Sequence, residues 1–334
     1  MAFRGSRMLL ALVILGGLAA GVIAALAGMI AFGTRAPPKP LASIGEPFKR
    51  VDFSDLPAEQ TVAARRASPI AYRRWNTAEK SSPERVVIAI HGSSASSQSL
   101  HPLAKALSAQ GITVYAPDIR GHGSTGQRGD IDHAGELDDD LADLVAMVRL
   151  AHPDAELALV GFSSGGGFAL HAAATLLGAS FKRVVLISPF LGPRAPTVKP
   201  QGNDPWATAF VPRFIALLLL NRVGIHAFDH LPVIAFAVLP EQAKFLSPTY
   251  SFLLATGFAT GDYAADLRNA RAPLAVLVGG NDELFEADRF APTIEAVRTD
   301  VSVTVVPGLD HIGMILDPRA VPAIAAALRG GEGK

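Results

Sequence analysis

Cysteine is absent from this 334-residue chain. Its absence excludes disulfide bonds, thiolate nucleophiles and metal sites with cysteine ligands, although it does not reveal the redox compartment. A charge excess of either sign is also missing, because 30 basic residues balance 30 acidic ones. Since no long stretch of Lys and Arg is available to follow a phosphate backbone, we expect no nucleic-acid partner. Hydrophobic residues make up 49% of the chain, which is enough for a sizeable core.

Charge is missing again from one long segment near the N-terminus, residues 8–32. About 20 apolar residues suffice to cross a bilayer as a helix, so we predict a transmembrane helix over 8–32 after a short tail at 1–7. The alternative is a cleaved signal peptide with secretion of the remainder, because "ALA" at Ala25 to Ala27 is a small-x-small cleavage site. We favour the uncleaved anchor because the apolar run continues past that site.

Basic residues flank the apolar segment on both sides, so the side of the membrane that the rest of the chain faces stays open. Residues 33–50 are rich in proline and poor in periodic apolar positions. This composition predicts an extended tether, with folding beginning at residue 51.

Beyond residue 51, short apolar runs alternate with stretches of helical periodicity. Continuous apolar runs are typical of strands buried on both faces of a parallel sheet, and the alternation predicts a doubly wound α/β fold. Two earlier segments, 60–66 and 70–76, are expected to enter the sheet as antiparallel strands. The predicted parallel strands are 85–92, 111–118, 155–162, 183–189, 273–280 and 301–308.

The run at 155–162 ends in "GFSSG", which fits the pattern G-x-S-x-G with Gly161, Ser163 and Gly165 in the fixed positions. A strand precedes the motif and a helical pattern follows it, which is the context of a nucleophile elbow, where a tight turn presents a serine above the sheet edge. A structural Ser-Gly turn is the alternative unless a base and an acid are also present.

Candidates for both partners follow in the order that this arrangement requires. Asp282 comes just past the predicted strand 273–280, and His311 comes just past 301–308. Both therefore belong to the same sheet edge as Ser163. We predict that His311 is the base and that Asp282 orients it, with Glu283 as the reserve acid.

Two backbone N–H groups are needed to stabilise an oxyanion, and removal of one such donor costs about 3 kcal/mol of transition-state stabilisation. One is expected from Ser164, the residue after the nucleophile, and the other from Ser93 in the loop "HGSSASSQS" after the strand at 85–92. A triad of this kind needs no cofactor.

Five ordered motifs, "HGSSASS", "PDIRGHGSTGQRGD", "GFSSGG", "GGNDELF" and "GLDHIGM", resemble the α/β-hydrolase superfamily, in particular monoacylglycerol lipase and lysophospholipase-like hydrolases of the serine aminopeptidase S33 type. The resemblance implies a cap inserted after the sixth strand. We accordingly expect a core at 51–189 and 263–334 and an apolar, helical cap at 190–262. Phe162 departs from the pattern, because many relatives have His before the nucleophile.

Other histidines and charged residues have simpler interpretations. Arg120 and His122 are expected to brace a loop, because the resemblance assigns "RGHGSTG" to a turn. His171, on the helix after Ser163, is expected to pack rather than react. His226 and His230 are four residues apart, but without a Glu after the first His or an obvious third ligand we predict no metal site.

Together these features predict a membrane-tethered serine hydrolase that cleaves carboxylic esters, with lipid-like esters such as monoacylglycerols or lysophospholipids as its substrates. Two alternatives remain: a peptidase or amidase of the same fold, because the triad does not distinguish esters from amides, and a catalytically silent membrane-bound binding protein. The intact set of candidate nucleophile, base, acid and oxyanion donors argues against a protein without catalytic activity. The acyl chain, the leaving group and the oligomeric state do not follow from the sequence.

Overall fold

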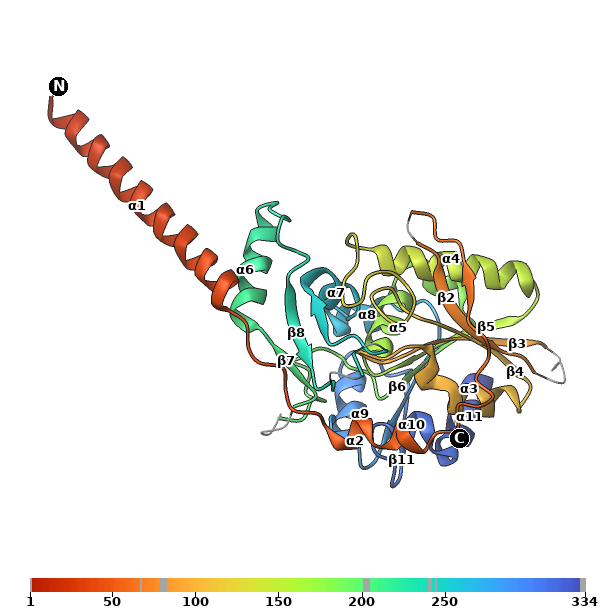
Figure 1. Cartoon of the computed structure of the whole chain (residues 1–334). Coiled ribbons are helices and arrows are strands. Elements are labelled where there is room, and N and C mark those ends of the chain that lie inside the picture. Colours follow the sequence, from red (N-terminus) through yellow and green to blue (C-terminus); the bar gives the residue numbers. More distant parts are fainter. Residues whose placement is uncertain are drawn as a thin grey trace.

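A computed structural model describes residues 2–66, 68–77, 83–200, 205–239, 242–243 and 245–330, with side chains from residue 12 onward. Its centre is an eight-stranded sheet in the order β1-β2-β4-β3-β5-β6-β10-β11 (Figure 1). The two pairings at the β1 edge, β1 with β2 and β2 with β4, are antiparallel and the others are parallel. The strands are β1 (Gln60–Val62), β2 (Ile70–Trp75), β3 (Arg85–Ile90), β4 (Ile112–Pro117), β5 (Glu156–Phe162), β6 (Arg183–Ile187), β10 (Leu274–Gly279) and β11 (Ser302–Val306).

Helices cover both faces of this sheet, as the alternating pattern predicts (Figure 1). The inner strands are buried on both faces, which is why their sequences are continuous apolar runs. One face packs on α4 (Glu136–Ala151), α5 (Ser164–Ala174), α8 (Tyr263–Asn269) and α9 (Ala287–Glu295). The other packs on α3 (His101–Ser108), α10 (Gly313–Leu316) and α11 (Val321–Arg329). The predicted doubly wound fold and its strands are confirmed.

The insertion between β6 and α8 is only partly helical. It holds α6 (Val211–Arg222) and α7 (Phe252–Gly257), and also a separate sheet of β7 (Ala207–Ala209), β8 (Pro232–Phe236) and β9 (Thr249–Ser251). The prediction of a helical insertion is therefore wrong for the apolar segment around β8. Val233 and Ile234 are β-branched and Pro232 begins the segment, so a strand that pairs on both sides suits it better than a helix.

The segment after α1 is not an extended tether along its whole length. Residues 33–41 form no helix or strand, but α2 (Ala42–Gly45) and a 3₁₀ turn (Pro47–Arg50) follow them. Ile44 is buried in the cluster on the α3 face, where it packs with the core. The prediction that folding begins at residue 51 is wrong, because three apolar side chains of this proline-rich stretch pack on the core: Leu41, Ile44 and Phe48.

Helix α1 (Ala2–Phe32) projects away from the rest of the molecule (Figure 1). Its segment Leu12–Phe32 has a mean hydropathy of 2.4 and is long and apolar enough to cross a membrane, while none of its most apolar window is buried in the protein. Among the side chains of α1 that the structure describes, those near its C-terminal end approach the remainder of the molecule. There Arg213 of α6 donates from Nε to the carbonyl oxygen of Ile30 over 2.8 Å.

Candidate active site

Ser163 lies in the sharp turn between β5 and α5. Its backbone has φ 55° and ψ −119°, a conformation that non-glycine residues rarely adopt. The flanking glycines are required by space: a Cβ at Gly161 would lie 2.2 Å from the carbonyl oxygen of Gly165, and one at Gly165 would lie 2.3 Å from that of His91. The motif is therefore a nucleophile-elbow geometry in which the serine alone carries a functional side chain.

Asp282 and His311 follow β10 and β11 at the same edge of the sheet. Nδ1 of His311 donates to Oδ2 of Asp282 over 2.8 Å, and both side chains are buried. Oδ1 of the carboxylate accepts the N–H groups of Leu284 and Phe285 at 2.9 and 3.0 Å. Burial raises the pKa of Asp282, but the charge and hydrogen bond of His311, with further hydrogen bonds, outweigh it, so that the pKa lies below its usual value. The carboxylate is therefore an anion that holds the imidazole in one orientation.

Glu283, the reserve acid, has a different position. Its Oε2 accepts the backbone N–H of His311 over 2.9 Å rather than contacting the ring. It therefore supports the loop that carries His311, and the orienting contact belongs to Asp282.

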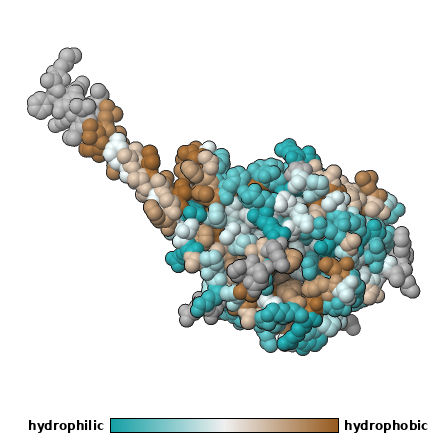
Figure 2. Space-filling model, viewed as in Figure 1, coloured by the Kyte–Doolittle hydropathy of each residue, from teal (hydrophilic) through white to brown (hydrophobic). Residues whose placement is uncertain are grey.

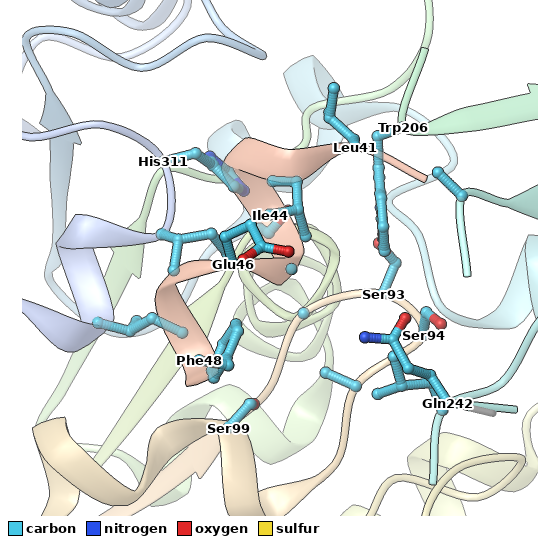
Figure 3. A pocket seen from close by; sticks show the side chains of 18 of the residues that line it. Leu41, Ile44, Glu46, Phe48, Ser93, Ser94, Ser99, Trp206, Gln242 and His311 are labelled. Carbon is cyan, nitrogen blue, oxygen red and sulfur yellow. The ribbon is translucent and has the colours of Figure 1, made fainter. Parts of the chain in front are cut away.

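Ser163 and His311 line the same cavity of about 410 Å³, and Figure 3 shows His311 at its wall. Within the described residues no hydrogen bond joins Ser163 Oγ to the imidazole. Such contacts are often long in the absence of substrate and tighten on binding. The ring of Phe162 lies 4.8 Å from that of His311, centroid to centroid, and so fixes one face of the imidazole.

The two predicted oxyanion donors are available. Throughout the described part of the chain, no backbone acceptor uses the N–H of Ser93 or of Ser164. For Ser164 this follows from its place at the start of α5, because the first N–H groups of a helix have no partner within it. For Ser93 it depends on the conformation of the loop after β3.

Ser94 gives that loop its shape. It has a positive φ of 65°, and its N–H donates to the hydroxyl of Tyr250 over 2.6 Å. Its carbonyl oxygen accepts the N–H of Ser247, and its hydroxyl donates to the Ser247 carbonyl oxygen. Two residues of the insertion therefore clamp the loop that carries Ser93.

His122 completes this clamp. Its Nε2 accepts from the Tyr250 hydroxyl over 2.5 Å, and its Nδ1 contacts the carbonyl oxygen of Ile119. Burial and the neighbouring His91 lower the pKa of His122 well below its usual value, which leaves it neutral and able to accept. Arg120 pairs with the buried Asp140 at 2.7 Å. Arg120 and His122 therefore brace the loop that carries them, as predicted.

The remaining candidates lie elsewhere. His171 sits between Asp138 and Asp266, 3.6 Å from each, and these two carboxylates raise its pKa to about 10. His226 and His230 do not converge, because the first contacts Asp229 and the second Asp130. The described residues contain no group of three or more His, Asp or Glu that could hold a metal ion.

Sequence reasoning missed three contributors to the site: Tyr250, Ser247 and Trp206. The indole Nε1 of Trp206 donates to Ser93 Oγ over 3.0 Å. Trp206 is one of only two tryptophans and Tyr250 one of four tyrosines, and this scarcity is the only local signal for them. Their role depends on contacts with residues more than a hundred positions away.

Comparison with known proteins identifies the family of this chain. The family model described as serine aminopeptidase, S33, matches residues 81–318, which is more than half of the chain. The chain belongs to this family of α/β-hydrolases. It is accordingly a serine hydrolase, as the sequence predicts.

Individual relatives of this S33 hydrolase include a monoacylglycerol lipase from Mycolicibacterium smegmatis, 27% identical over 260 residues, which cover 72% of this chain and 85% of the relative. Among solved structures, a monoglyceride lipase from Saccharomyces cerevisiae has a TM-score of 0.61 at 17% identity, over 82% of this chain and 94% of that one. A bacterial membrane phospholipase A has a TM-score of 0.54 at 19% identity, over 97% of this chain and 98% of that one. The two structural likenesses concern the fold.

Proposed function

We propose that this S33 hydrolase is a membrane-tethered esterase for lipid-like carboxylic esters, and that Ser163, His311 and Asp282 carry its chemistry. Ser163 Oγ attacks the ester carbonyl carbon while its proton passes to His311. The charge that develops on the carbonyl oxygen is stabilised by the N–H groups of Ser93 and Ser164. The carbon–oxygen bond then breaks, and the imidazolium returns the proton to the leaving alkoxide.

A second half-reaction releases the acid. Water attacks the acyl-enzyme carbonyl and gives a proton to His311, and Ser163 recovers a proton as the ester bond to the enzyme breaks. Asp282 stays ionised throughout, which agrees with its lowered pKa. Its part is to hold the imidazole and to stabilise the imidazolium.

The observation that carries the lipid proposal is the apolar surrounding of Ser163. Phe162, Ile312 and Ile315 line the cavity beside it, together with apolar side chains of the insertion and of α2. Mostly apolar pockets with few polar groups suit hydrocarbon chains. The similarity to a monoacylglycerol lipase supports the same substrate class.

Membrane tethering is supported by the apolar surface that α1 shares with α6. In Figure 2 apolar residues gather on α1 and on the neighbouring α6. Helix α6 and the turn after it expose several large hydrophobic side chains: Val211, Ile215, Leu218, Leu219, Val223, Ile225 and Phe228. A surface of this kind is costly in water and favourable in a bilayer.

The test begins with a fluorophosphonate probe, which reacts covalently with an activated serine. We expect labelling of the wild-type protein and none of Ser163→Ala. A panel of esters with increasing acyl length, together with matched amides, then separates the proposal from a peptidase or amidase. A protein that is not labelled and hydrolyses nothing would instead be a binding protein of the same fold.

A further inference from the structure

Two cavities meet at Ser163 rather than one. The first, of about 410 Å³, is the cavity shown in Figure 3, and the second, of about 360 Å³, extends toward β8 and α7. Both are within the size range of ligand pockets. Ser93, Ser163 and Trp206 line both of them. An ester whose carbonyl carbon lies at Ser163 therefore has two cavities for its two halves.

The position of His311 assigns the two halves. Among the described residues, His311 lines the larger cavity and is not among those that line the smaller one. The imidazolium must give its proton to the leaving oxygen, so the alcohol half has to lie on the side of His311. The larger cavity is then the leaving-group cavity, and the acyl chain extends into the smaller one.

Apolar side chains of the segment that follows the N-terminal helix form one wall of the leaving-group cavity. Figure 3 shows Ile44 and Phe48 beside this cavity. Further apolar side chains come from Phe162, Ile312 and Ile315 on the core and from Leu246 of the insertion.

Several polar side chains around this cavity are engaged within the chain. Lys49 and Glu46 pair with each other over 2.6 Å and are exposed at the rim. Ser99 donates to the carbonyl oxygen of Ser96, and the side chain of Gln242 accepts the N–H of Leu239. A polar leaving group such as glycerol would need several donors and acceptors directed at it. Most of the side chains that line this cavity are apolar, so hydrocarbon contact dominates it.

We infer that the leaving-group cavity binds an alcohol that carries a hydrocarbon chain, so that the preferred substrates have apolar chains on both sides of the ester bond. Diacyl lipids, in which the leaving alcohol bears the second acyl chain, are the natural class of this kind. Monoacyl lipids fill only one of the two cavities. The inference rests on the proposed function and specifies its substrate.

The experiment uses the full chain in detergent micelles and a fixed octanoyl group, esterified to alcohols of two, four, six and eight carbons. We expect kcat/KM to rise with alcohol length by up to about fourfold for each added CH₂ until the cavity is full. A second series keeps the ethyl alcohol and varies the acyl chain. Diacyl and monoacyl glycerols of equal acyl length are then compared directly.

Matched substitutions separate the two cavities. Ile44 lines only the larger and Ile234 only the smaller. Ile44→Ser should lower the ratio of rates on octyl and ethyl esters by about tenfold and leave the acyl-length dependence in place. Ile234→Ser should weaken the acyl-length dependence and leave the ratio of rates on octyl and ethyl esters in place. Phe48→Ser and Phe190→Ser form a second pair if either isoleucine variant fails to fold, which fluorophosphonate labelling reports.

Three other outcomes are distinguishable, and they contradict either the inference alone or the proposed function as well. If the rate ignores alcohol length but follows acyl length, the inference fails while the proposed function stands. If the two isoleucine variants exchange their effects, the larger cavity binds the acyl chain, and the inference that it binds the alcohol fails. If the wild-type protein is neither labelled nor active on any ester, the proposed function fails and the inference falls with it.

Discussion

The two sides of the candidate active site are built in different ways. The proposed chemical side consists of Ser163, Asp282 and His311, which follow β5, β10 and β11 in the parallel part of the sheet. The covering side consists of residues 41–50 and the insertion, which reach Ser163 from distant parts of the chain. Strand register places the first set, because β5, β6, β10 and β11 are neighbours in that order. Only packing places the second.

The groups for chemistry are therefore encoded over short stretches of sequence, whereas the groups for selectivity come from residues far apart in the sequence. A reactive serine needs a local backbone conformation, and the glycines around Ser163 provide it. The wall of a cavity for a hydrocarbon chain needs only apolar side chains, and tertiary packing can bring these from any part of the sequence. Changes to the chemical side should therefore abolish turnover, and changes to the covering side should redistribute it among substrates.

The largest effect is expected at the nucleophile. Ser163→Ala should lower turnover by about six orders of magnitude, because no other group can form the acyl-enzyme. Ser164→Ala should keep fluorophosphonate labelling, because its proposed contribution is a backbone N–H. Labelling and single-turnover hydrolysis measure both variants. A dead Ser164→Ala beside an active Ser163→Ala would move the nucleophile by one residue.

The second effect concerns the orienting acid. Asp282→Asn should lower kcat by about 10⁴-fold, because an amide cannot hold the required tautomer of His311. Circular dichroism should show that the variant remains folded. A folded Asp282→Asn protein with wild-type activity would assign the acid to another residue.

The third effect concerns the N-terminal helix and the proposed membrane tether. Deletion of residues 1–33 should leave kcat/KM on soluble esters within about twofold, and lower the rate on esters in bilayers by up to about a hundredfold, because only encounter is impaired. Liposome and micelle assays compare the two. A deletion extended to residue 50 removes Ile44 and Phe48 as well, and should also reduce the preference for long alcohols. Equal rates on bilayers with and without residues 1–33 would argue against a tether.

The smallest effect joins the two sides. Tyr250→Phe removes the acceptor of the Ser94 N–H, and an unpaired buried N–H costs about 1–3 kcal/mol of stability. The loosened loop should also lower kcat, by less than the roughly hundredfold loss that follows removal of an oxyanion donor. Tyr115→Phe is the matched control, because its hydroxyl bonds to His152 in the core. It should lose stability without losing kcat, as judged from thermal unfolding and steady-state rates. Equal kcat losses in both variants would remove the special role of Tyr250.

Much of the chemical side could be predicted from the sequence. The apolar runs identified the parallel strands, and the residues that directly follow three of them are the ones that the structure brings to one edge. The prediction of the site therefore depended on hydrophobic periodicity and on the order of the motifs along the chain, both of which can be read from the sequence. The family resemblance adds the expected position of an insertion but not its internal structure.

The covering side was predictable only in its hydrophobicity. Residues 33–50 were expected to be an extended tether and the insertion to be helical. Both expectations are wrong in part, the first over residues 42–50 and the second at β8. A proline-rich segment folds when a few apolar side chains find a surface, and an apolar segment becomes a strand when partner strands exist on both sides. Neither the surface nor the partners are visible in the segments themselves.

The sequence alone thus determined the sheet, the elbow at Ser163, and the order of acid and base along the chain, because backbone sterics and apolar periodicity act over a few residues. Tertiary structure alone decided that Tyr250 and Ser247 hold the loop of Ser93, and that Ile44 and Phe48 line the same cavity as His311. These contacts join residues far apart in the chain, and their free energy comes from burial and hydrogen bonding that exist only once both partners have folded.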